Sequence, residues 1–264
     1  MMGCREIRLV AGYELRRIFR QHFFLIMMLL LSVCSIVSLL GLTKNAAWEC
    51  ALRLHSDFPQ LLFSSSVFSM FFLFFVLNYS VSLFRSVNAE RESRLSEFYL
   101  SFLSPEVLLY GKILAYSVLC VVHLLLMEIV AFAVVAPHCE SVLPLVLLQL
   151  GRFSMLVAGF GFYMSLFALA ASWAERHAEM QGVMLFVTAL CILSYFAPDF
   201  VSQNRFLMII PFTAPFMAAD NLSLISLLSF AVMLCSIYVV MKYAGVVYKK
   251  RLFYYGKNKI EKRG

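Results

Sequence analysis

Long apolar blocks separated by short charged segments are the main pattern of this sequence. A helix of about 20 apolar residues is long enough to cross ~30 Å of hydrocarbon, and most of the blocks reach that length. The pattern predicts an all-α, polytopic membrane protein whose single transmembrane domain covers residues 1–264. Six transmembrane helices are expected, at Phe23–Leu42, Gln60–Phe84, Val107–Ala136, Leu143–Trp173, Gly182–Pro198 and Leu222–Tyr243.

Residues 1–22 precede the first apolar block and predict a basic amphipathic helix. At 100° per residue, apolar side chains gather on one side and arginines on the other. The apolar side holds Ile7, Val10, Ala11, Leu15 and Ile18, and the opposite side holds Arg5, Arg16 and Arg20. Glu14 falls among the apolar set. We expect an interfacial helix in the headgroup plane; the alternative is a charged leader that only fixes topology.

Residues 206–219 are apolar but too short to cross the membrane and return as helices. Pro211 and Pro215 would interrupt any continuous helix here. We interpret the segment as a re-entrant hairpin that dips into the outer leaflet, with its irregular backbone shielded by protein. The alternative is an apolar loop that lies on the outer surface.

Composition and charge support this membrane assignment. Of the 264 residues, 62% are hydrophobic and 14% are charged, whereas soluble domains carry roughly 25% charged residues. The net charge of +7 comes from basic residues at the two ends, including the tail 244–264, and beside the apolar blocks. Only Lys44, Arg53 and Arg205 fall in predicted outside loops. This asymmetry predicts cytoplasmic N- and C-termini, and it gives no support for a nucleic-acid partner.

Motifs for catalysis are missing from the sequence. No G-x-x-x-x-G-K-[ST], H-E-x-x-H or G-x-S-x-G motif occurs, so we expect neither an enzyme nor a cofactor in this chain. The seven cysteines show no paired metal-type spacing. Cys50 and Cys139 are the two in predicted outside loops, and a disulfide between them is left open.

Ionisable residues inside predicted spans are candidates for function, because a charge in hydrocarbon costs several kcal/mol. Glu128 and Arg152 both lie roughly 12–15 Å below the outer face. Their helices are joined by a short turn, so we predict an intramembrane ion pair, either a clasp between helices or part of a substrate path. His123 is interpreted as a packed or snorkelling residue.

The charged segment after the second span predicts a short amphipathic helix. Its apolar side holds Leu95, Phe98, Tyr99 and Phe102, and its polar side holds Glu90, Arg94, Glu97 and Ser101. The helix should end before Pro105, where the next helix begins. Such a helix between two spans could dock a cytoplasmic partner. The alternative is a solvated loop whose charges set topology.

This segment resembles the signature of type-2 ABC exporter permeases, E-R-E-x-G-T-L-E-L-L-L followed by a Pro-bearing turn and a Gly-Lys pair. The matching residues are Glu90, Arg91, Glu92, Glu97, Pro105, Gly111 and Lys112. The basic leader, the span count, the Pro-x-x-x-Pro segment and the basic tail extend the resemblance. Arg94 and Leu95 depart from the usual Gly-Thr. The Leu-Phe-Arg before the acidic cluster is also similar to the haem-exporter permease of cytochrome c maturation.

The resemblance implies the permease subunit of an ABC exporter, a multi-pass protein of the bacterial cytoplasmic (inner) membrane. Residues 85–106, here named the coupling segment, would then seat on a separate ABC ATPase through Glu90, Arg91, Glu92, Arg94, Glu97 and Phe98. ATP and Mg would bind to that ATPase. Two permease copies, or one copy with a related permease, would enclose the translocation path of the substrate. An ATP-independent secondary carrier or channel is the alternative from another class.

Overall fold

The computed structural model describes residues 4–20, 65–92, 103–135, 142–174, 177–200, 205–217 and 224–261. Within these ranges every regular element is a helix: α1 (Cys4–Arg20), α5 (Ser65–Glu92), α7 (Pro105–Val135), α8 (Val142–Trp173), α9 (His177–Phe200), η2 (Arg205–Met208), α10 (Ala214–Met217) and α11 (Leu224–Glu261). Five of the described helices are long and apolar enough to cross a membrane. The predicted first span, Phe23–Leu42, lies outside the described residues, as do Cys50 and Cys139.

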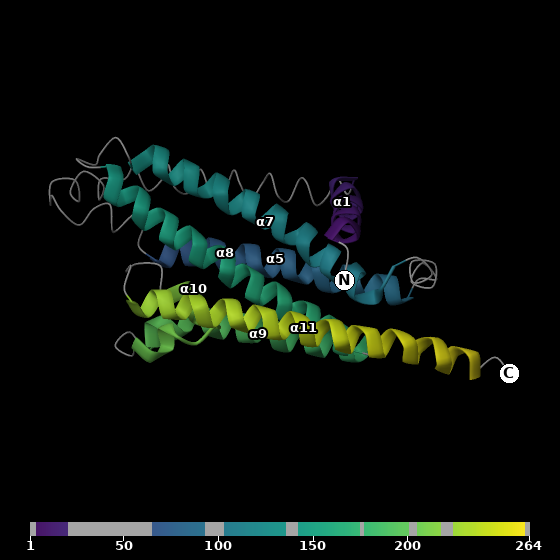
Figure 1. Cartoon of the computed structure of the whole chain (residues 1–264). Helices are drawn as coiled ribbons and strands as arrows, with labels where there is room; N and C mark the ends of the chain where they lie inside the picture. The colour runs from purple at the N-terminus through teal and green to yellow at the C-terminus, as the bar shows by residue number, and fades with distance from the viewer. Residues whose placement is uncertain are drawn as a thin grey trace.

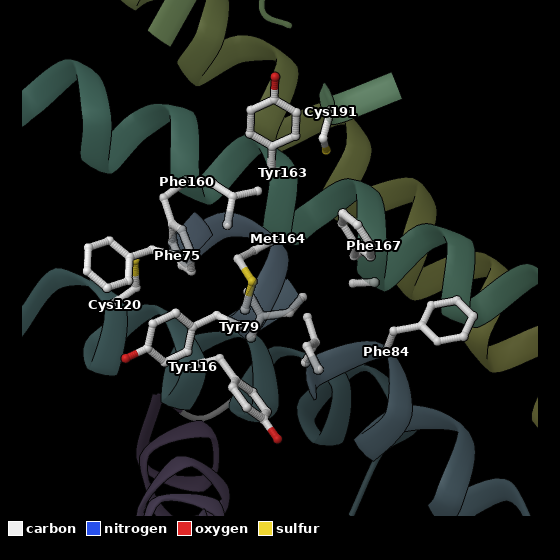
Figure 2. Packing of buried hydrophobic residues seen from close by; sticks show 14 of the residues in the cluster. Phe75, Tyr79, Phe84, Tyr116, Cys120, Phe160, Tyr163, Met164, Phe167 and Cys191 are labelled. Carbon is white, nitrogen blue, oxygen red and sulfur yellow. The ribbon is translucent and has the colours of Figure 1, made fainter. Parts of the chain in front are cut away.

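Helix α8 is the centre of the bundle and packs against α5, α7, α9 and α11 (Figure 1). Aromatic side chains from α5 and α8 surround Met164, among them Phe75, Tyr79, Phe160 and Phe167 (Figure 2). Tight packing of large side chains gives the bundle a core even though lipid offers no hydrophobic drive between helices. By contrast, α9 and α11 bury few of their residues, and they expose large apolar side chains such as Leu185, Phe186 and Leu227.

Helix α1 crosses the first part of α7 instead of running along the bundle (Figure 1). Its apolar side is the one that faces protein, since Val10, Ala11 and Ile18 are buried. Its other side exposes arginines together with Leu9 and Tyr13. The predicted amphipathic face thus contacts α7, and a position in the headgroup plane stays a prediction.

Several helices run beyond the predicted spans. Helix α5 continues to Glu92, α9 begins at His177 and α11 continues through most of the basic tail to Glu261. Hydropathy marks where hydrocarbon ends, whereas a helix can continue into water as long as its residues favour it. The predicted start of α7 is confirmed: it begins at Pro105, and the Ser104 carbonyl accepts a hydrogen bond from the Leu108 N–H at 3.2 Å.

Candidate functional site

The coupling segment contains the last two turns of α5 and the first two residues of α7. Glu90, Arg91 and Glu92 form the last turn of α5, so they do not begin a separate helix as the sequence pattern predicted. The reason is that no helix-breaking residue stands between the second apolar block and this acidic cluster. Arg94, Glu97 and Phe98 lie outside the described residues, and their role in docking stays a prediction.

A buried lysine on α7 contacts α5, so it joins the two helices at either end of the coupling segment. Lys112, in the second turn of α7, has no exposed side-chain surface. Its ammonium donates hydrogen bonds to the carbonyl oxygen and to Oγ of Ser86 on α5, each at 2.8 Å. Glu14 of α1, also buried, places Oε1 3.7 Å from the same nitrogen. We name Glu14, Ser86 and Lys112 the Lys112 cluster.

Next to this cluster, α1 approaches α7 at Gly111. A β-carbon added to Gly111 would lie 2.5 Å from Cγ1 of Val10 and 3.3 Å from the carbonyl oxygen of Ile7. Val10 in turn packs with Val107 and Leu108. Only glycine leaves room for this contact. Gly111 and Lys112 therefore hold the same face of α1, because Gly111 lets Val10 approach α7 and Lys112 pairs with Glu14.

The sequence contained a signal for this cluster that the pattern alone did not resolve. Glu14 stood as an exception within the apolar face of α1, and Lys112 stood inside an apolar block. A buried carboxylate and a buried ammonium each need an opposite charge, and the structure supplies it by crossing α1 over α7. Ser86 could not be recognised from the sequence, because one of its two hydrogen bonds with Lys112 is made by its backbone carbonyl, a group that every residue has.

A second polar group lies within the membrane-spanning part of α7 and α8. Both predicted residues, Glu128 and Arg152, are buried there. Gln149 Nε2 donates to Oε2 of Glu128 at 2.7 Å and to its backbone carbonyl at 3.1 Å. The charge of Arg152 acts electrostatically on the Glu128 carboxylate. Gln149 was missed by the sequence reasoning, and a direct Glu128–Arg152 ion pair stays a prediction.

His123 of α7 takes part in a hydrogen bond inside the bundle. Its Nδ1 lies 2.7 Å from the hydroxyl of Tyr79 on α5, and its ring contacts Phe75 with centroids 5.6 Å apart. The imidazole is thus packed between helices, one of the two roles predicted for it.

The Pro-bearing segment packs against the middle of α8. Residues 205–217 form η2, a series of turns and the short helix α10. Pro215 is buried against Gly159, where an added β-carbon would lie 2.6 Å from Cβ of Pro215 and closer still to its Cγ. Pro211 is half-buried and lies in the turns, so both prolines stand where no long helix is formed, as predicted.

Hydrogen bonds and ring contacts hold this segment in place. The hydroxyl of Tyr163 on α8 donates to the Phe212 carbonyl at 2.5 Å, and Ser229 Oγ on α11 donates to the Met208 carbonyl at 2.5 Å. Phe216 lies edge-on to Phe72, with ring centroids 5.4 Å apart. Side chains of the spanning helices thereby satisfy carbonyls that a regular helix would have satisfied itself.

None of these groups has the arrangement of a catalytic or metal site. Among the described residues, no three His, Cys, Asp or Glu side chains lie close enough to hold a metal ion. Comparison with known proteins yields one family model, described as "ABC-2 family transporter protein", which matches residues 54–245. The search of curated proteins finds no match for this chain.

Proposed function

Because the chain belongs to the ABC-2 family of transporter proteins, we propose that it is the permease of an ABC exporter, driven by a separate ATPase. The family match over residues 54–245 is the observation that carries this proposal. The chain is a multi-pass membrane protein and a transporter permease, and its five long apolar helices fit that assignment. Export, the ATPase partner and the substrate go beyond the family match.

In this proposal the termini and the coupling segment face the cytoplasm of a bacterial cell. The distribution of Lys and Arg supports that orientation, including the basic residues in the last part of α11. An ABC ATPase that binds ATP and Mg²⁺ would dock on the coupling segment. Its closure on ATP would shift the ends of α5 and α7 as a rigid body.

A translocation path requires a second permease copy or a related permease beside this one. We place residues 206–219 at its outer end, as a re-entrant hairpin that closes the exit. The contact of Pro215 with Gly159, in the middle of the membrane-spanning part of α8, supports re-entry of this segment. Irregular backbone at that depth needs the shielding and the hydrogen bonds from Tyr163 and Ser229.

Copurification with an ABC ATPase and measurement of its ATP hydrolysis test the proposal. Replacing Glu90 and Glu92 by lysine reverses two charges at the coupling segment, and we expect lower permease-stimulated ATP hydrolysis with normal membrane insertion. Glu6→Lys, a charge reversal at an exposed position of α1, is the control and should leave hydrolysis unchanged. Undiminished stimulation in the double variant would contradict docking at this segment.

An ATP-independent carrier or channel is the second candidate, favoured by one observation. Glu128, Gln149 and Arg152 form a polar group within the membrane-spanning helices, and such groups commonly line ion or proton routes. Ion-dependent flux through the purified chain in vesicles, with no ATPase bound, would support this function over an ATP-driven permease.

A further inference from the structure

The Lys112 cluster connects three helices at the coupling segment. Ser86 lies six residues before the last residue of α5, and Lys112 lies seven residues after the first residue of α7. The coupling segment begins within α5, one residue before Ser86, and ends at the second residue of α7. Glu14 adds α1, which lies far away in the sequence.

The contacts of the cluster differ from those of an exposed ion pair. Lys112 and Glu14 are both almost completely buried, so each charge has lost its water and depends on the other groups of the cluster. Arg17 adds a second cation 3.5 Å from the same Oε1 of Glu14. A relative shift of α5 and α7 would break the hydrogen bonds of Lys112 to Ser86, and a shift of α1 would break the ion pair between Lys112 and Glu14.

Packing makes the same connection independently of charge. Val10 fills the space over Gly111, and Ile7 and Leu103 pack against the cluster of Val10, Val107 and Leu108. Leu103 belongs to the coupling segment itself. Because close-packed interfaces switch between discrete arrangements instead of deforming, α1 should follow the coupling segment.

We propose that Glu14, Ser86 and Lys112 are positioning residues that fasten α1 to the coupling segment, so that docking of the ATPase there also orders α1. The proposal rests on the proposed function, since it requires an ATPase that docks. It gives the Gly111–Lys112 pair a role: the glycine admits α1 and the lysine fixes it. A change in the coupling segment on ATP binding would then also move α1, including its exposed arginine face.

Hydrogen–deuterium exchange of the permease–ATPase complex tests this, with and without a non-hydrolysable ATP analogue. In the wild type, we expect the loaded ATPase to slow exchange both in residues 93–102 and in α1, by at least roughly fivefold, the low end of typical coupling between sites. In Glu14→Gln/Lys112→Met, residues 93–102 should still be slowed, whereas α1 should not respond. The control Glu6→Gln/Lys242→Met changes the same residue types at exposed positions and should behave as wild type.

Ser86→Ala is the second and milder variant. It removes only the hydroxyl acceptor on α5 and leaves Glu14 beside Lys112, so the exchange of α1 without ATPase should equal that of the wild type. The response of α1 to the loaded ATPase should nevertheless fall. If the cluster were a purely structural clasp, Ser86→Ala would change the exchange of α1 without ATPase together with its response to the loaded ATPase.

Two results would overturn the proposal and leave the proposed function standing. The first is protection of residues 93–102 with no response of α1 in the wild type. The second is a full response of α1 in Glu14→Gln/Lys112→Met, which would mean that the ATPase reaches α1 by another route. If no ATPase protects residues 93–102 at all, docking there fails, and this inference fails with it.

Discussion

Replacing Gly159 by alanine should weaken the contact between α8 and the Pro-bearing segment. The new methyl group would lie 2.6 Å from Cβ of Pro215 and 3.2 Å from Cζ of Phe72. Neither neighbour is the free end of a flexible chain, so one of the two elements must move. Overpacking of this kind costs about 1–3 kcal/mol, partly offset by about 0.8–1 kcal/mol from the better helix propensity of alanine.

The matched control is Gly161→Ala, two residues further along the same helix. There the added β-carbon meets only Cδ1 of Ile237, at 3.4 Å, an ordinary contact. The gain in helix propensity is the same in both variants and cancels in the comparison. Gly159→Ala should therefore be less stable than Gly161→Ala by about 1–3 kcal/mol.

Thermal unfolding of the two purified variants in detergent measures this difference. For a domain of 150–250 residues, 1 kcal/mol corresponds to about 2–4 °C in Tm, so Gly159→Ala should melt at least about 2 °C below Gly161→Ala. Amides of residues 205–217 should also exchange faster in Gly159→Ala. Equal melting temperatures would refute the seating of Pro215 on Gly159 and, with it, the support for a re-entrant segment.

Three further experiments use substitutions elsewhere in the bundle. Tyr163→Phe removes the donor to the Phe212 carbonyl and should lower stability by about 0.5–1.5 kcal/mol; an unchanged Tm would mean that the bond contributes nothing. Glu128→Lys or Arg152→Glu alone should abolish the yield of monodisperse protein, and the double reversal should restore it. A double variant worse than both singles would show that the two do not pair. Gly182→Ala, with no atom within 4 Å of the new methyl, should raise stability by about 0.8–1 kcal/mol, measured as a higher Tm; a lower Tm would indicate a covered α9 surface.

The apolar blocks predicted the long helices because hydrocarbon imposes a minimum length on every span. Four of the predicted spans overlap α5, α7, α8 and α9, and the sixth overlaps α11. Pro105 predicted the start of α7, since proline suits a first helical turn. The same blocks could not predict how far α5 and α11 continue, because hydropathy does not report helix propensity in water.

The polar contacts were harder to predict, since they join residues that lie far apart in the sequence. Glu14 was visible as an exception, yet its partner Lys112 is 98 positions away and is reached only because α1 crosses α7. Gln149 and Ser86 looked like ordinary polar residues near helix ends. Their importance arises from a neighbouring helix, which a one-dimensional pattern cannot contain.

Helix α11 runs without interruption for 38 residues, about 57 Å. Tyr110 of α7 contacts it at Gly245, and Lys249 lies 3.8 Å from Glu106. Inserting a single residue between Leu224 and Gly245 would rotate everything beyond it by 100° about the helix axis. The basic tail would then point in a different direction. Helical phase thus links the length of the last span to the direction of the tail, so insertions or deletions within α11 should be tolerated only after both contacts.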